Sequence, residues 1–424
     1  MRHRIALALV LSIIIPCLSG CFGSKELDDW GYAYTIGIDK GISDKLRLTV
    51  QLAALKQGSG GGSQQSPSSG KHQSDITVMS VDCPSLSSGA QMLNTSLSRT
   101  LNFMHIKYIV ISEDLAREGV SASMRAAERN YQIRRTTNII ISKEPAIDFI
   151  KGLNPTLGTS LTKTQQLLLE HEEDTGLFNT VPSNEFINDT KSTYKMPSAT
   201  LAALNDFSHF KESGNPSEGF KSPGDYTAGE LPRQGGNDYE FFGTAIFDGD
   251  RMVDELNGDE SRALLMVEGQ FKAGVIVIAD PKKPDLRVSV NTFEGKKPEI
   301  KVSFADGKPV INVKVFLEGD IISLQSSIEY ESENLKPLLE ERYRSFIKDM
   351  LDRTRKKCQK SGCDIFGFGE IAAMHFLTIP EWEAYHWFEK FKTAEVNTDV
   401  EFIIRRTGTI IKTNPSQTVE GPKK

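Results

Sequence analysis

The chain opens with an apolar run that is too short to cross a membrane. Arg2 and Arg4 introduce the run, which reads IALALVLSIIIP and ends at Pro16. A positively charged start followed by a short apolar segment is typical of a secretory signal peptide. A membrane-spanning helix needs about 18 consecutive apolar residues, and no later segment reaches that length. We therefore expect residues 1–20 to be removed and the rest of the chain to fold outside the cytoplasmic membrane.

The residues that follow the run, Leu18-Ser19-Gly20-Cys21, fit a lipobox. Small residues before the cleavage point let the chain lie extended in a signal peptidase, and the thiol of Cys21 can carry a thioether-linked diacylglycerol. Two acyl chains, each contributing about 0.8 kcal/mol per buried methylene, give a durable anchor. We therefore predict lipid attachment at Cys21. The alternative is an ordinary signal peptide with an incidental cysteine.

Composition limits the partners of the remaining chain. The 424 residues suggest two or three domains, and the 38% of hydrophobic residues suffice for real cores. The net charge is −6, and it becomes −8 once residues 1–20 leave, because that segment holds two arginines and no acid. A chain with no net positive field is a poor nucleic-acid binder, so we expect no nucleic-acid partner.

The order of strand-like and helix-like segments predicts the fold class. Strands alternate with helices in the first half, whereas the second half is rich in strands and then in helices. We predict a multidomain α+β fold with mixed or antiparallel sheets packed against helices. Two low-complexity segments interrupt it, a Gly/Ser/Gln loop at 57–74 and a Gly/Pro-rich linker at 209–238. The predicted units are a signal peptide (1–20), an N-terminal α/β-type domain (21–208), the linker (209–238), a C-terminal α+β domain (239–411) and a flexible tail (412–424).

In the second half, a hairpin over 241–254 is expected to open the C-terminal domain, because Asp-Gly-Asp at 248–250 is a strong turn signal. Separate strands are predicted over 286–292 and 299–304. A long helix is predicted over 332–360, since its apolar residues recur at three- and four-residue spacing. A further helix is predicted over 381–391.

No catalytic pattern emerges from the sequence. His171 has no second histidine four residues away, so a zinc-peptidase helix is missing, and neither a Gly-x-Ser-x-Gly elbow nor a phosphate-binding loop is present. Residues 367–372 match Gly-x-Gly-x-x-Ala, but a charged helix precedes them where a dinucleotide site needs a strand. We therefore predict no enzyme activity, no cofactor and no metal. We expect a tight turn whose glycines allow close backbone approach, so that Gly367→Val lowers stability.

Aromatic residues gather near this turn and on the following helix. Phe366 and Phe368 flank Gly367, and Trp382 and Trp387 are not spaced for one helix face. Core packing is the favoured interpretation, and the alternative is an exposed contact patch. The candidate partner contacts are therefore Phe366, Phe368, Trp382 and Trp387.

Three cysteines remain beyond Cys21. Cys358 and Cys363 could pair outside the membrane, or they could stay buried thiols together with Cys83. The sequence leaves both possibilities open.

Several segments together resemble the Ger(x)C family, the C-subunit lipoproteins of bacterial spore nutrient-germinant receptors. Each match is weak alone, but their order covers nearly the whole mature chain, and the segments at 57–74, 209–238 and after residue 411 resemble insertions or tails. The matching segments are Cys21 with Glu26-Leu27-Asp28-Asp29, the stretch YTIGIDK at 34–40, Ile133-Arg134-Arg135-Thr136, Gly243-Thr244-Ala245-Ile246-Phe247, Asp364-Ile365-Phe366-Gly367-Phe368-Gly369, Pro380-Glu381-Trp382 and the last strand to Gly408.

The resemblance implies a non-catalytic receptor subunit, held by its N-terminal diacylglycerol on the outer face of the inner spore membrane. Its implied partners are two integral-membrane subunits, of the A and B type, and its implied role is in nutrient-triggered germination. Two other classes compete with this interpretation. A free-standing solute-binding lipoprotein of a transporter would need two similar doubly wound lobes, and a cell-wall hydrolase would need paired acids or a metal cluster.

Overall fold

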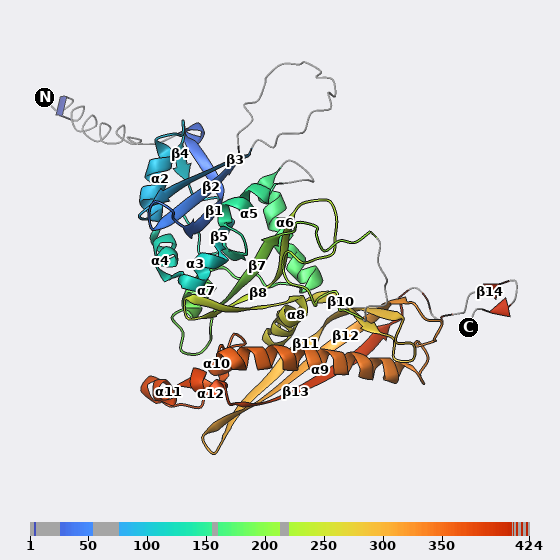
Figure 1. The fold of residues 1–424 in the computed structure, drawn as a ribbon. Coiled ribbons are helices and arrows are strands. Elements are labelled where there is room, and N and C mark those ends of the chain that lie inside the picture. Colours follow the sequence, from blue (N-terminus) through green and yellow to red (C-terminus); the bar gives the residue numbers. More distant parts are fainter. Residues whose placement is uncertain are drawn as a thin grey trace.

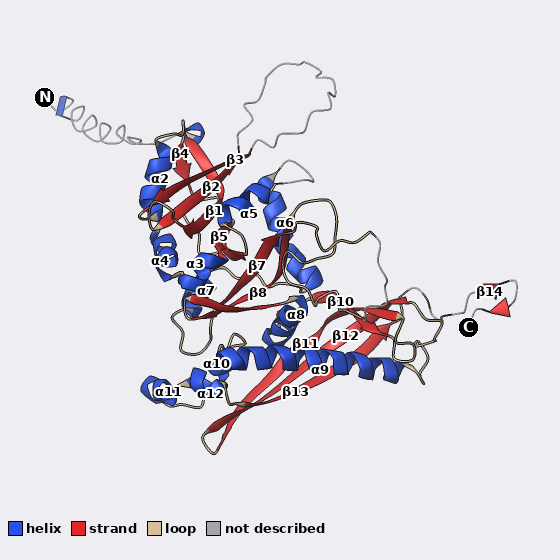
Figure 2. Cartoon of the chain, viewed as in Figure 1, coloured by secondary structure: helices blue, strands red, loops and turns tan. Residues whose placement is uncertain are grey.

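The computed structural model describes residues 4–5, 26–53, 76–154, 160–212, 220–408, 410, 413, 417–418 and 421–422. Two large sheets, each packed with helices, form the molecule (Figures 1 and 2). This is the multidomain α+β class with mixed sheets that the sequence predicts. The predicted signal peptide beyond residues 4–5, the lipid site at Cys21, the loop at 57–74 and most of the predicted tail lie outside the described residues.

The first sheet has nine strands within the described residues, in the order β3-β2-β1-β5-β6-β7-β8-β9, with β4 paired to β1. Its middle is parallel, and hairpins make both ends antiparallel. The strands are β1 (Trp30–Lys40), β2 (Leu46–Ala53), β3 (Ile76–Cys83), β4 (Thr100–Asn102), β5 (Tyr108–Ser112), β6 (Asn138–Ser142), β7 (Ser198–Leu204), β8 (Tyr239–Asp248) and β9 (Arg251–Leu256).

Helices cover both faces of this sheet. Along β5, Ile109 and Ile111 pack into one core, whereas Tyr108 and Val110 pack into another on the opposite face. A strand that is buried on both faces reads as a continuous apolar run, which explains why β5 shows no alternation. The covering helices are η1 (Leu27–Asp29), α2 (Leu86–Asn94), α3 (Glu113–Glu118), α4 (Ser121–Arg129), α5 (Ala146–Gly152), α6 (Leu161–Thr175) and α7 (Ser183–Asp189).

The second sheet is smaller and has the order β10-β11-β12-β13. Its strands are β10 (Ala273–Ala279), β11 (Arg287–Ala305), β12 (Lys308–Leu324) and β13 (Glu395–Arg406). The prediction of two strands at 286–292 and 299–304 is wrong, because β11 runs through both. Register shifts between Glu294 and Glu299 absorb the Gly-Lys-Lys-Pro segment without ending the strand. Asp306 and Gly307, both with positive φ, close the long hairpin.

One helix packs along the second sheet and four short ones flank it. Helix α9 (Lys336–Ser361) buries Leu339, Tyr343, Ile347 and Met350, the spacing that the sequence predicts. The Tyr343 hydroxyl lies 2.9 Å from the carbonyl oxygen of Val288 in β11. The other helices are α8 (Gly258–Glu268), α10 (Phe368–Ala373), α11 (Ile379–Tyr385) and α12 (Trp387–Phe391), and a two-stranded sheet of β14 (Gln417–Thr418) and β15 (Gly421–Pro422) lies near the C-terminus.

The hairpin β8–β9 belongs to the first sheet, not to the second half that the sequence assigns it to. Strand β8 pairs with β7, so the predicted linker at 209–238 connects two neighbouring strands of one sheet. Part of that segment is packed, since Ser222 and Ala228 are buried and Arg233 pairs with Glu240 at 2.6 Å. Helix α8 follows, buried on all sides between the two sheets. The sheets are therefore joined by a shared core rather than by a free linker.

Candidate interaction surface

The chemistry-bearing side chains form no metal centre. In the part of the chain that the structure describes, no three His, Cys, Asp or Glu side chains are placed to hold an ion. No described helix has the length and apolar character that crossing a membrane requires. Cys83, Cys358 and Cys363 are buried free thiols, and burial raises the pKa of Cys363 to about 11.

The four side chains that the sequence offers as partner contacts are buried. Phe366, Phe368, Trp382 and Trp387 all belong to the core of the second sheet. The predicted single helix over 381–391 is wrong, because His386 adopts a positive φ and splits it into α11 and α12. The break turns both tryptophans inward, with ring centroids 5.7 Å apart. Core packing is therefore the correct interpretation, and the contact patch at these four residues is not.

A buried carboxylate organises this turn. Asp364 accepts hydrogen bonds from the backbone N–H of Gly369 at 2.8 Å and from the indole Nε1 of Trp387 at 2.9 Å. A longer bond of 3.3 Å comes from the N–H of Phe368. Burial raises the pKa of Asp364 to about 6 even though these donors oppose the shift. The resemblance includes Asp364, but sequence reasoning gave it no role, since a lone Asp before a Phe-Gly-Phe-Gly turn does not reveal its donors.

The two glycines of the turn have different reasons to be glycine. Gly367 has a φ of +77°, which favours glycine, and a Cβ there would make only ordinary contacts with the side chains of Lys195 and Glu370, the nearest atom being the Lys195 Cδ at 3.5 Å. At Gly369 a Cβ would overlap the carbonyl oxygen of Tyr194 and lie 2.6 Å from the Trp387 Nε1. The close backbone approach expected at Gly367 therefore occurs at Gly369.

A buried lysine joins the two parts of the molecule beside this turn. The Lys195 Nζ lies 2.7 Å from Glu268, 3.7 Å from Glu185 and 3.9 Å from Asp189. Burial opposes its charge, but the surrounding carboxylates raise the pKa of Lys195 above its ordinary value. Burial also raises the pKa of Asp189 to about 7. The Lys195 ammonium group thus forms ion pairs with carboxylates of both α7 and α8.

The segment around Lys195 also holds the C-terminal helices by direct contacts. The Met196 N–H donates to the carbonyl oxygen of Asp364 at 2.8 Å, and the Trp382 Nε1 donates to the Thr193 hydroxyl at 3.0 Å. The Tyr194 ring stacks on Trp382 with centroids 5.3 Å apart. Helices α10–α12 are therefore fixed on the rest of the molecule.

On this fixed base, the loop between α10 and α11 carries apolar side chains into solvent. Met374, Leu377 and Ile379 are 80%, 93% and 63% exposed. Phe376 points the other way and packs against the rings of Phe304, Trp382 and Tyr385. We call Met374, Leu377 and Ile379 the apolar loop. Sequence reasoning missed it, although the run FLTIP contains more apolar residues than one inward face can use.

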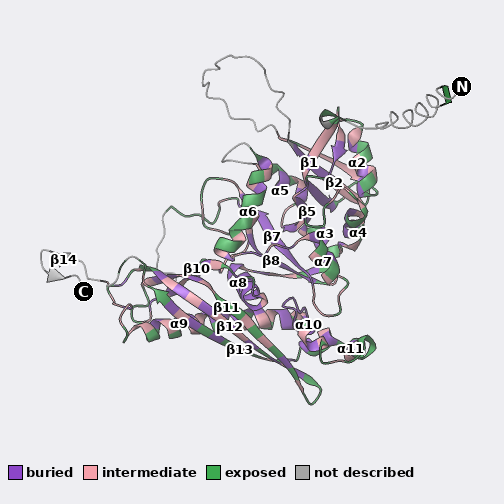
Figure 3. Cartoon of the chain, turned by 180° about the vertical axis from the view of Figure 1, so that it is seen from behind, coloured by how far each residue is buried: buried purple, intermediate pink, exposed green. Residues whose placement is uncertain are grey.

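A hollow of about 210 Å³ adjoins α11 and α12. Its walls are mostly apolar, with acids at the edge, and consist of Thr193, Trp382, Glu383, His386, Trp387, Phe388 and Glu389. Trp382 and Trp387 thus reach solvent only as the floor of a small depression. Figure 3 shows exposed residues along α11 at this end of the molecule.

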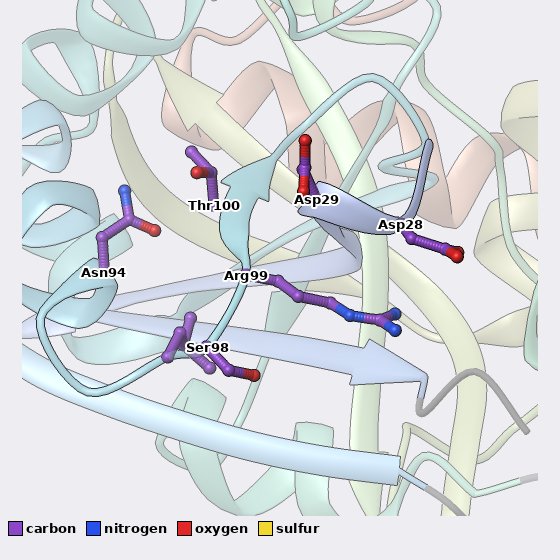
Figure 4. Close-up of a pocket in the computed structure, with 7 residues that line it drawn as sticks. Asp28, Asp29, Asn94, Ser98, Arg99 and Thr100 are labelled. Atoms are coloured by element: carbon purple, nitrogen blue, oxygen red, sulfur yellow. The ribbon is translucent and has the colours of Figure 1, made fainter. Parts of the chain in front are cut away.

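A second hollow, of about 500 Å³, lies at the end of the molecule where the described chain begins. Asp28 and Asp29 of η1 form one side, and Asn94, Leu97, Ser98, Arg99 and Thr100 form the other. Figure 4 shows Arg99 reaching across beneath the turn that carries Asp28 and Asp29. The hollow is open and polar, and it lies seven residues after Cys21 in the sequence.

Comparison with known proteins matches two segments, which together make up most of the chain, to two protein families. The family described as spore germination protein N-terminal domain matches residues 23–204, and the family described as spore germination B3/GerAC like, C-terminal, matches residues 242–408. The chain therefore belongs to the GerAC-like family of spore germination proteins.

Individual relatives agree over nearly their full lengths. The chain is 25% identical to spore germination protein KC of Bacillus subtilis (strain 168), covering 97% of each chain. It is 24% identical to the putative spore germination protein YfkR of the same organism, covering 97% of this chain and 98% of the relative. The crystal structure of the GerBC protein superposes with a TM-score of 0.50 at 16% identity, over 90% of this chain and 99% of that one. The fold of the family thus extends to this chain.

Proposed function

We propose that this chain is a lipid-anchored, non-catalytic subunit of a spore nutrient-germinant receptor and takes part in nutrient-triggered germination. The observation that carries the proposal is the succession of Cys21 and the two family matches at 23–204 and 242–408. Its partners are integral-membrane subunits of the A and B type, and its place is the outer face of the inner spore membrane.

The distance along the chain supports a short tether. Glu26, the first residue of the main described segment, is five residues from Cys21, which spans at most about 18 Å. A diacylglycerol on Cys21 therefore holds η1 and the first sheet close to the membrane surface. Partners within the same membrane then meet this subunit at a high effective concentration.

The alternative of a free-standing solute-binding lipoprotein finds no support in the architecture. That class needs two similar lobes with a ligand cleft between them. Here one sheet has nine strands and the other four, in unrelated orders, and the buried helix α8 fills the space between them. The relatives that match nearly the whole chain are also named as spore germination proteins.

The anchor is tested by Cys21→Ala in spores, with membrane fractionation and nutrient-triggered germination as readouts. We expect the variant to leave the membrane fraction and to lose the nutrient response. Cys17→Ala is the matched control, because Cys17 lies in the predicted signal peptide four residues earlier and should change neither readout. Unchanged retention and unchanged response in Cys21→Ala would reject the proposal.

A further inference from the structure

We propose that the apolar loop (Met374, Leu377 and Ile379) is the docking surface for another subunit of the receptor complex. We further propose that the segment docking there presents apolar side chains flanked by Lys or Arg. This inference rests on the proposed function and adds the contact site and the chemistry of the partner.

The apolar loop concentrates exposed hydrophobic surface in six residues. Leu377 is the most exposed large hydrophobic side chain among the described residues, and Met374 and Ile379 lie beside it in the sequence. Single exposed hydrophobic residues are ordinary on a protein surface, but a cluster marks an interaction site. Burial of these three side chains removes apolar area from water, which is the main driving term of association.

The loop is held in place from below, so that little ordering is needed on binding. The inward side chain Phe376 packs among rings, and the Tyr385 hydroxyl donates to the carbonyl oxygen of Gly307 at 3.1 Å. The Leu377 N–H donates to the Glu381 carboxylate at 3.2 Å, and the Thr378 hydroxyl caps α11. A preorganised loop loses less conformational entropy in a complex than a mobile one.

Charge around the loop selects the partner. Residues 370–391 contain four acids, which are all exposed, and a single lysine, Lys390. Asp306 and Lys308 at the nearby hairpin tip offset each other. An apolar patch within an acidic rim attracts a segment with basic flanks. The acids are Glu370, Glu381, Glu383 and Glu389.

The same charges disfavour the other occupants. An anionic membrane surface would repel the acidic rim and attracts basic segments instead. A second copy of this chain in a two-fold dimer would place equal patches against each other, acid facing acid. The apolar loop, which leads into α11, also lies at the opposite end of the molecule from β4, which pairs with the start of β1, the first strand after the predicted anchor (Figure 1). A protein segment is therefore the occupant that the surface fits.

The experiment uses the full chain in spores that carry an affinity tag on an integral-membrane receptor subunit. Detergent-solubilised membranes are purified through the tag, and the amount of this chain that is recovered is measured. Leu377→Asp should lower recovery and nutrient response about tenfold or more, as loss of a central contact does. Ile42→Asp is the matched control, because Ile42 is 84% exposed on the β1–β2 turn at the other end and should leave recovery unchanged.

Charge is tested separately with Glu383→Lys, whose side chain has no described partner within the chain that it would break. Recovery should fall severalfold, and raised salt should weaken the wild-type complex. Equal protein levels and equal thermal unfolding of all variants establish that each one folds.

The outcomes separate this inference from the proposed function. If wild type is recovered with the tagged subunit and Leu377→Asp is recovered equally well, the docking surface is wrong and the proposed function stands. If Leu377→Asp is recovered fully with the tagged subunit but no longer binds lipid vesicles that the wild type binds, the loop contacts lipid and the inference is overturned. If wild type itself is not recovered, the proposed function fails first.

Discussion

The two sheets of this protein use their apolar residues in different ways. In the first sheet, β5 and β6 are buried on both faces and pack helices on each side. In the second, β10 and β12 alternate between buried and more exposed residues, because α9 covers only one face. The central strands of the first sheet are therefore buried on both faces, whereas the second sheet leaves one face partly exposed to solvent. Between them lies a polar junction around Lys195 and Asp364, and these three environments should respond differently to mutation.

The largest effect is expected at the junction, from Lys195→Met. The change leaves the largely buried carboxylates of Glu268 and Asp189 without a cation, and breaking a buried pair in this way costs about 3–5 kcal/mol. Chemical denaturation of the mature chain measures the loss. Lys191→Met is the control, since Lys191 pairs with Glu128 at 3.4 Å on the exposed surface and should cost about 1 kcal/mol or less. Equal effects would show that the junction is not as closed as its contacts indicate.

The contrast between the sheets is tested by one substitution made twice. Ile140→Ala in β6 removes a fully buried side chain and should cost about 2–5 kcal/mol. Ile322→Ala in β12 removes a side chain that is 54% exposed and should stay within about 0.5 kcal/mol of wild type. Thermal unfolding of both variants gives the comparison. A large loss at Ile322 would mean that the open face of the second sheet is covered.

A third pair compares the glycines of the turn on which the second region docks. Gly369→Ala drives a methyl group into the Tyr194 carbonyl and the Trp387 ring and should cost about 1–3 kcal/mol. At Gly367 an added methyl group makes only ordinary contacts with Lys195 and Glu370, so Gly367→Ala should cost only the strain of its positive φ, about 1 kcal/mol. Unfolding free energies rank the two. The reverse order would place the close approach at Gly367 after all.

The last prediction concerns pH, and its effect develops only as the pH rises above about 4. Burial raises the pKa of Asp364 to about 6 from an ordinary 3.8, so the folded state holds this proton more tightly than the unfolded state does. The stability that the proton contributes is complete below about pH 4 and is lost as the pH rises through 6. Asp364→Asn lacks this titration and should gain, relative to wild type, about 2–3 kcal/mol between pH 4 and pH 7, because each pKa unit is worth about 1.4 kcal/mol. Melting temperatures of both proteins across this range provide the measurement, and a constant difference would contradict it.

The sequence pattern predicts a strand or helix best where the residues of that element by themselves favour its conformation and burial. The runs at 108–112 (YIVIS) and 138–142 (NIIIS) are built on consecutive apolar residues, and the structure makes both of them buried strands. Strand β7 was missed, because Ser-Ala-Thr-Leu-Ala-Ala-Leu at 198–204 has few of the β-branched residues that favour strands, and its neighbours β6 and β8 impose the conformation. Helices α3 and α4 follow each other closely but are separate, because Gly119, just after Glu118, has a φ of +133°.

The candidate surface shows the same division. The family resemblance and the lack of catalytic motifs were available from the sequence, and so was the concentration of aromatic residues near Phe366 and Trp382. Which of them face solvent was not, since the break at His386 turns both tryptophans inward and leaves Leu377 outside. One residue in the left-handed region reverses the expected faces of the segment.

The sequence by itself determined the α+β class, the order of most strands and helices, and membership of a germination family, because these depend on local periodicity and on motifs in a fixed order. Only the tertiary structure decided that β8 and β9 complete the first sheet, that Lys195 joins α7 to α8 and Asp364 fastens α10 to α12, and that the apolar loop is presented to solvent. Each of these features depends on which distant segments of the chain pack together. Whether a side chain is buried is decided by that packing and not by the residue type alone.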